Sequence, residues 1–140
     1  MAREEVLEQT ENARSYYIDF EKADELHRSL STMVAARKCY VCKQADTDES
    51  IMASEPQEHI DRIVEMCSDT SDYLLPDTPL KEAIFRVMLA EGTREITAVE
   101  ISEILTARWA VSTYPRDLSP KVIGRLLDNS DSYCISAVPE

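Results

Sequence analysis

Four cysteines are the residues of this sequence best suited to specific chemistry, and two of them have a metal-binding spacing. Cys39 and Cys42 form a CxxC pair, a turn in which two thiolates converge as half of a tetrahedral zinc site. The other half must come from elsewhere in the chain, and the candidates are His59 and Cys67. The pattern therefore predicts one structural zinc ion, held by ligands drawn from these four residues.

Helix geometry limits how His59 and Cys67 can share a metal ion. On one continuous helix they would be separated by about 12 Å along the axis, whereas each ligand of a zinc ion lies about 2.0–2.3 Å from the metal. Either the helix starts after His59, or it ends before Cys67, or only one of the two binds. Two further roles stay open for the cysteines: small buried apolar side chains, or redox-sensing thiols. We expect Cys134 to lie in the core.

Charge constrains the class of partner. The formal net charge is −12, from 15 basic and 27 acidic residues, which disfavours a general polyanion binder because affinity for phosphates rests on Lys and Arg. Positive charge dominates in residues 105–127, where Asp117 is the only acid. Lys121 and Arg125 are four apart and so share one helix face. The candidate DNA-contacting residues are Arg108, Arg116, Ser119, Lys121 and Arg125.

Other function classes lack sequence support. The chain has no nucleophile elbow, P-loop, dinucleotide fingerprint, HExxH motif or EF-hand loop, so we expect no enzymatic activity. Its longest apolar runs are far shorter than the roughly 20 residues that span a bilayer, so we expect no membrane contact. The N-terminus, MAREEVLEQTENARS, is charged throughout, which predicts a cytoplasmic protein without a secretory signal. The excess of Arg over Lys and of acid over base also fits a salt-adapted surface, on which net charge says little about partners.

The N-terminal part of the chain reads as helical. Apolar residues recur at steps of three and four over 3–38, which predicts one long helix or two in series. Residues 39–54 lose this periodicity and are expected to form a loop. A helix starting at Pro56, or just before it, then runs to about Cys67. These elements predict a helical region over residues 1–75 that carries the CxxC metal site.

The C-terminal part, residues 76–140, has clearer helix signals. A Thr-Pro pair begins a helix that stops at Gly92. A TAVE capping box at Thr97 begins a second helix, and a Ser-Pro pair at Ser119 begins a third. The segment SYCISAV, residues 132–138, alternates like a strand.

This order of helix, short extended piece, helix, loop, helix and strand resembles the winged-helix family of helix-turn-helix domains over roughly residues 78–138. The resemblance is carried by the TAVE-capped helix and by LSPKVIGRLL followed by YCISAV. It implies that the third helix, 120–128, enters the major groove of DNA, and that residues 94–96 pair with YCISAV, residues 133–138. We therefore predict a mainly α fold: an N-terminal helical region and a winged-helix-like domain over 76–140 with a small two-stranded sheet.

The leading hypothesis for function is a DNA-binding protein of transcription or replication control, which contacts double-stranded DNA through helix 120–128. The N-terminal helices would supply a surface for a protein partner or a homodimer. Tyr16, Tyr17 and Phe20 belong either to that surface or to the core.

The alternative is an acidic protein-interaction adaptor, or a DNA mimic, that uses the same scaffold without binding nucleic acid. The net charge of −12 supports it. The two hypotheses differ in whether the four basic residues of 105–127 gather on one face. If they scatter, or pair with Asp117 and Asp128, the adaptor is favoured.

Overall fold

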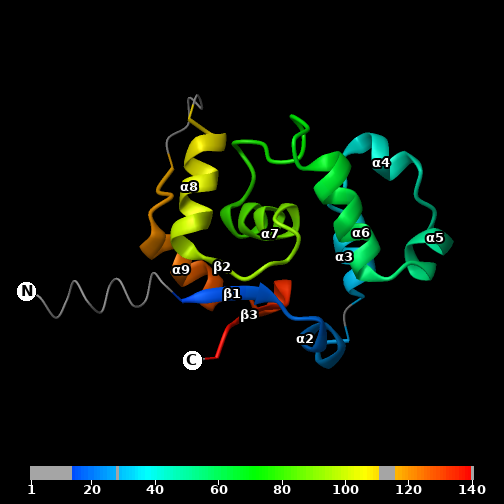
Figure 1. Cartoon of the computed structure of the whole chain (residues 1–140), viewed down its shortest axis with the longest axis horizontal. Coiled ribbons are helices and arrows are strands. Elements are labelled where there is room, and N and C mark those ends of the chain that lie inside the picture. The colour runs from blue at the N-terminus through cyan, green and yellow to red at the C-terminus, as the bar shows by residue number, and fades with distance from the viewer. Residues whose placement is uncertain (1–13, 28, 111–115, 140) are drawn as a thin grey trace, which may run out of the picture.

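The computed structural model describes residues 14–27, 29–110 and 116–139. It is mainly α-helical with a small antiparallel sheet (Figure 1), which confirms the predicted fold class. The elements, in chain order, are β1 (Ser15–Ile18), α2 (Phe20–Glu25), α3 (Leu30–Ala35), α4 (Tyr40–Gln44), α5 (Asp48–Ala53), α6 (Pro56–Arg62), the π-helical turn η1 (Ile63–Cys67), α7 (Leu80–Ala90), β2 (Ile96–Thr97), α8 (Ala98–Arg108), α9 (Pro120–Asp128), the 3₁₀ turn η2 (Asp131–Tyr133) and β3 (Ile135–Ala137).

The sheet contains a strand that the sequence reading assigned to a helix. β1 lies between the other two strands, in the order β2-β1-β3, and both pairings are antiparallel. Tyr16 and Ile18 are buried while Tyr17 is partly exposed, so this stretch alternates with the period of a strand, and aromatic and β-branched residues favour strands. The prediction of helix over 3–38 is therefore wrong at β1, and its first part, residues 3–13, lies outside the described residues. The predicted direct pairing of β2 with β3 is replaced by pairing through β1.

The region expected to be a loop, residues 39–54, contains two short helices instead. α5 begins with a capping box, in which the side chain of Thr47 accepts from the backbone N–H of Ser50 and Ser50 returns the bond. Such a box stabilises a short helix that has no apolar periodicity of its own. In Figure 1, α4 and α5 lie at one end of the molecule, beyond α3 and α6.

Packing runs across the predicted boundary near residue 75. One core cluster joins Tyr16 of β1 and Val34 of α3 to Ile60 of α6, Phe85 of α7 and Ile101 of α8. The sheet likewise takes its central strand from the N-terminal part of the chain.

The C-terminal helices follow their sequence signals. α7 begins at Leu80, one residue after the predicted start, and Gly92 follows its end with a φ of +75°, a conformation that favours glycine. The capping box of Thr97 with Glu100 begins α8, and the side chain of Ser119 caps α9. α8 and α9 pack closely: a Cβ on Gly124 of α9 would stand 3.9 Å from the Cβ of Ala98.

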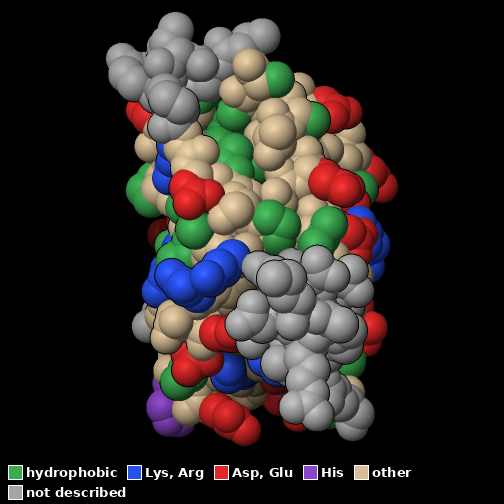
Figure 2. Space-filling model, turned by 90° about the vertical axis from the view of Figure 1, so that its left-hand side faces the viewer, with side chains coloured by type: hydrophobic (Ala, Val, Ile, Leu, Met, Phe, Trp, Pro, Cys, Tyr) green, Lys and Arg blue, Asp and Glu red, His purple; other side chains and the backbone are tan. Residues whose placement is uncertain are grey.

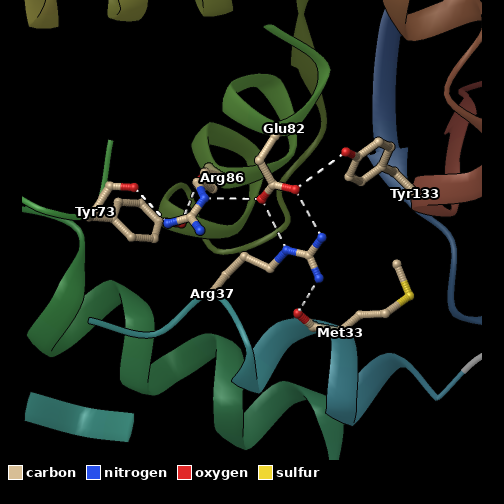
Figure 3. A network of polar contacts seen from close by, with 6 residues as sticks. All are labelled: Met33, Arg37, Tyr73, Glu82, Arg86 and Tyr133. Atoms are coloured by element: carbon tan, nitrogen blue, oxygen red, sulfur yellow. Dashed lines mark hydrogen bonds and ion pairs between the residues drawn. The ribbon is translucent and has the colours of Figure 1, made fainter. Parts of the chain in front are cut away.

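A polar network centred on Glu82 of α7 joins the two parts of the chain (Figure 3). The carboxylate of Glu82 accepts from Arg37 through Nε at 3.0 Å and through the second guanidinium nitrogen at 2.9 Å. Arg86, one turn along α7, donates to it at 3.0 Å, and the hydroxyl of Tyr133 donates at 3.3 Å. The guanidinium of Arg37 also lies 5.1 Å from the ring centre of Phe85. Glu82 therefore ties the end of α3 to α7 and η2.

We predict that Glu82→Gln lowers the free energy of unfolding by about 2 kcal/mol at neutral pH, because two partly buried guanidinium groups lose their shared anion. Denaturant unfolding monitored by circular dichroism measures the loss. Glu103→Gln, at an exposed position of α8, is the matched control and should stay within about 0.5 kcal/mol of the wild type. Equal losses of stability in the two variants would contradict the role of Glu82 as the shared partner of Arg37 and Arg86.

The same carboxylate predicts a pH dependence. Burial raises the pKa of Glu82, but the hydrogen bonds and charges of Arg37 and Arg86 outweigh burial and hold it below its usual value. A depressed pKa contributes stability that is complete above the ordinary carboxyl pKa and is lost as the pH falls through the folded-state value. The difference in stability between wild type and Glu82→Gln should therefore shrink below about pH 4.5. A difference that stays constant down to acid unfolding would contradict this prediction.

Candidate metal centre

Three of the four predicted metal ligands come together in the structure. The Sγ atoms of Cys39, Cys42 and Cys67 all lie within 4.8 Å of one another. Cys39 is the residue that precedes α4, Cys42 lies within α4, and Cys67 ends the π-helical turn that continues α6. The cluster therefore joins α4 to η1 through Cys39 and Cys67, which are 28 positions apart in the chain.

Local hydrogen bonds orient the cysteines. The backbone N–H of Cys39 donates to the Sγ atom of Cys67 at 3.2 Å. The next N–H, that of Tyr40, donates to a carboxylate oxygen of Asp72 at 3.3 Å. The hydroxyl of Thr70 donates to the carbonyl oxygen of Cys67 at 2.8 Å. The start of α4 is thus held against the end of η1, at Cys67, and against Asp72 in the segment that follows η1.

The cluster differs from a set of ordinary exposed thiols. Cys39 and Cys67 are buried and Cys42 is partly exposed. Burial raises the pKa of the Cys67 thiol to about 12. Burial also raises the pKa of Cys39, but hydrogen bonds from the backbone of Cys42 and from Cys67 bring it below its usual value. A bound cation would favour the thiolate form at all three positions.

The donor set fits a soft or borderline metal ion. Thiolates bind zinc at about 2.3 Å, so sulfurs on a tetrahedron around zinc lie about 3.8 Å apart. Sulfurs already within 4.8 Å reach this spacing through small side-chain rotations. Three thiolates fill three of the four positions, and no fourth Cys, His, Asp or Glu joins the group in the part of the chain that the structure describes.

His59, the fourth predicted ligand, does not join the cysteines. Its ring is buried, and Nε2 lies 3.1 Å from the carbonyl oxygen of Ile51. His59 and Cys67 lie on α6 and on the turn that continues it, so the helical rise holds them apart. Of the alternatives from the sequence, the structure matches the one in which only one of the two residues accompanies the CxxC pair, and that residue is Cys67. Cys134 is buried, as expected.

Two of the predicted DNA-contacting arginines are engaged within the protein. Arg108 donates to the carbonyl oxygens of Ser68 at 3.0 Å and Thr70 at 2.8 Å. Arg116 donates to the carbonyl oxygens of Pro76 and Thr78. Both guanidinium groups therefore support the segment between η1 and α7.

The remaining predicted residues lie on or beside α9. Lys121 and Arg125 are exposed and form no ion pair with any described residue. The hydroxyl of Ser119 accepts from the N–H of Val122 and so caps the helix. Asp117 accepts from the N–H of Ser119, and Asp128 accepts from the hydroxyl of Tyr16.

The predicted basic cluster is therefore divided: Arg108 and Arg116 bind backbone carbonyls, whereas Lys121 and Arg125 face solvent. On the face seen in Figure 2, areas of Lys and Arg lie among areas of Asp and Glu and apolar side chains. Residues 111–115, which belong to the loop predicted before the third helix, lie outside the described residues.

The predicted aromatic surface is also divided. Tyr16 belongs to the core, Tyr17 is partly exposed, and Phe20 is 39% exposed. Sequence reasoning missed a further exposed pair, Tyr40 and Val41, which lie between the two cysteines of the CxxC pair and are 69% and 74% exposed.

The signal that could have found this pair is the presence of two large apolar residues between candidate metal ligands.

Comparison with protein-family models, with curated proteins and with solved structures finds no match to this chain. Among the described residues, no helix combines the length and apolar character needed to cross a bilayer.

We predict that Arg108→Ala lowers the free energy of unfolding by about 1–2 kcal/mol, because two carbonyl oxygens lose a charged donor. Arg125→Ala, which removes an exposed guanidinium from α9, should change it by less than about 0.5 kcal/mol. Denaturant unfolding of the two variants side by side makes the comparison. The division between engaged and exposed cations would be wrong if Arg125→Ala were the more destabilising change.

Proposed function

We propose that this chain is a zinc-stabilised protein-interaction module. The observation that carries the proposal is the exposure of Tyr40 and Val41, 69% and 74%, on the short helix that the cysteine cluster attaches to η1. Large apolar side chains kept in water beside a rigid centre are typical of a surface that a partner covers.

Zinc is the metal that the site supports best. Three thiolates with no carboxylate in the group favour a borderline or soft ion over magnesium or calcium. The ion would hold the start of α4, a helix of five residues, to the end of the π-helical turn η1. When bound, it supplies structural cross-linking and a compact local charge.

We predict that the reduced protein binds one zinc ion per chain, and that Cys67→Ser removes most of this binding. Removal of zinc by a chelator should lower the melting temperature, because binding to the folded state adds to its stability. Elemental analysis after dialysis measures the stoichiometry, and calorimetry measures the melting temperature. Acidification should weaken binding, since protons compete for the thiolates.

Cys134→Ala is the matched control for this experiment, since Cys134 is a buried cysteine outside the cluster. It should retain one zinc ion per chain. Equal loss of zinc from the Cys67 and Cys134 variants, or a protein that takes up no zinc, would contradict the proposed centre.

The charge distribution supports a protein partner over nucleic acid. The chain carries a net charge of −12, and Arg108 and Arg116 are hydrogen-bonded to backbone carbonyls of the protein itself. Selection of a random peptide library on the zinc-loaded protein tests the proposal. We expect related peptides that bind in solution and that lose affinity when zinc is removed. A library that yields no binding peptide, or peptides that bind the zinc-free protein equally well, would contradict it.

DNA binding through α9 is the second candidate function. It is favoured by the order α7, β2, α8, α9 and β3, which is the order that the winged-helix resemblance implies, and by the exposure of Lys121 and Arg125 on one helix. The sheet departs from the one that the resemblance implies, because β1 lies between β2 and β3. Two free cations would engage about two phosphates, which gives a weak and strongly salt-dependent complex.

A titration of mixed-sequence duplex DNA, followed by fluorescence anisotropy at low salt, separates the two candidates. The interaction module predicts no salt-dependent binding by the wild type. DNA binding predicts an affinity that falls with salt and disappears in the Lys121→Glu/Arg125→Glu double variant. Glu103→Lys, which adds a positive charge on α8, controls for a general effect of net charge.

A further inference from the structure

A hollow of about 550 Å³ lies beside the cysteine cluster and is bounded by α4, α5, α6 and η1. Figure 1 shows α4 and α5 at the outer end of the molecule, on the far side of α6 from the sheet. Its charged lining residues are Lys38, Asp46, Glu58 and Arg62, and its large apolar lining residues include Val41 and Met66.

The rim of the hollow is apolar and exposed. Val41 of α4 and Met66 of η1 both line it and are 74% and 53% exposed. Tyr40 of α4 and Met52 of α5, which are 69% and 68% exposed, lie outside the lining but on helices that bound the hollow. Methionine side chains are flexible and polarizable, and they adapt to apolar segments of differing shape. The rim therefore offers apolar contacts to an incoming side-chain face.

The polar groups of the hollow are largely satisfied by the protein itself. Nζ of Lys38 is buried and lies 3.1 and 2.9 Å from the two carboxylate oxygens of Asp46. His59 is buried with its Nε2 atom against the carbonyl oxygen of Ile51. The positive charge of Lys38 is neutralised by Asp46, and Arg62 is the exposed cation among the residues that line the hollow.

The surroundings of the hollow are acidic. Residues 38–67 contain seven acidic residues against three basic ones, Lys38, Lys43 and Arg62. The exposed residues Glu58 and Arg62 both line the hollow itself. A divalent ion bound by three thiolates leaves a net negative charge, so a metal at the cluster would not reverse this sign. An acidic margin around apolar anchors complements a segment that carries both Lys or Arg and apolar side chains.

We infer that this hollow is the docking site for a basic amphipathic segment of a partner protein, whose apolar face lies against Val41 and Met66 and whose cations face Glu58 and the acids around it. The inference rests on the proposed interaction function and names its surface and the chemistry of its partner.

The metal centre sets the geometry of this site. Val41 lies between Cys39 and Cys42 in sequence, and Met66 directly precedes Cys67. A metal that joins the three sulfurs therefore fixes the separation of the two rim residues. The docking site depends on the zinc centre even though the peptide does not contact the metal.

Two synthetic peptides test the inference: one with Leu and Lys at amphipathic helix spacing, and a counterpart with Glu at every Lys position. Each is titrated into the zinc-loaded, ¹⁵N-labelled protein, and amide shift changes are mapped by NMR. We expect the Lys peptide to shift amides of α4, the end of α6 and η1, and the Glu peptide to leave them unchanged. Raising the salt concentration should weaken binding of the Lys peptide.

Two variants with matched controls locate the contact. Val41→Ser/Met66→Ser should weaken binding of the Lys peptide by at least about ten-fold. Leu26→Ser/Leu75→Ser removes two exposed apolar side chains (44% and 46%) outside the hollow. This double variant should bind the Lys peptide as the wild type does. Glu58→Gln should weaken binding, whereas Glu103→Gln should not. The four positions changed in the two double variants are exposed, so we expect each variant to fold. The zinc content of each variant then verifies that it retains the metal centre.

The outcomes separate this inference from the function on which it rests. Equal binding of the Lys and Glu peptides, shifts that map to another face, or equal effects of the two double variants would overturn the docking site. The interaction function would still stand if peptides from the library selection bind at that other face. It would fail together with the docking site if neither the designed nor the selected peptides bind.

Discussion

Three consecutive side chains, Arg37, Lys38 and Cys39, hold the chain in place where α3 gives way to α4, and Arg37 joins it to the C-terminal part. Arg37 makes a two-point ion pair with Glu82 of α7 and stacks on Phe85. Lys38 pairs with Asp46, and Cys39 accompanies Cys42 and Cys67. Arg37 therefore joins the chain to α7, Lys38 joins it to Asp46 between α4 and α5, and Cys39 joins it to η1. Buried charges that have defined partners select one arrangement over others of similar compactness, and here they place α4 beside the end of α6.

The cysteine cluster and the exposed surface beside it depend on that placement. α4 has five residues and buries none of its side chains, so packing alone does not hold it. Its attachments are the thiol cluster and the bond from Tyr40 to Asp72. The proposed metal at the cluster would explain how so short a helix can present Tyr40 and Val41 to solvent in a defined position. The segment that carries Asp72 is supported in turn by Arg108 and Arg116, residues that look like nucleic-acid contacts in the sequence.

What could be predicted from the sequence were features whose partners lie close in the chain. Three such features join residues that are three positions apart, and the structure contains all of them: the cap of Thr97 with Glu100, the Ser119 cap of α9 and the CxxC pair. The features that were missed depend on distant partners. β1 is four residues long and gains its hydrogen bonds from strands far along the chain. Arg108 finds its acceptors 38 and 40 residues away. The choice of Cys67 over His59 required the position of α4 relative to η1, which no local spacing encodes.

X-ray absorption at the zinc edge, recorded on the reduced, zinc-loaded protein, tests the central claim most directly, because it counts the atoms that bind the metal. The account predicts three sulfur neighbours at about 2.3 Å and one nitrogen or oxygen neighbour. Four sulfurs would require a cysteine from outside the cluster, and fewer than three would mean that Cys39, Cys42 and Cys67 do not act together. The first result would contradict the predicted set of three sulfur ligands, and the second would contradict a zinc centre that holds α4 to η1.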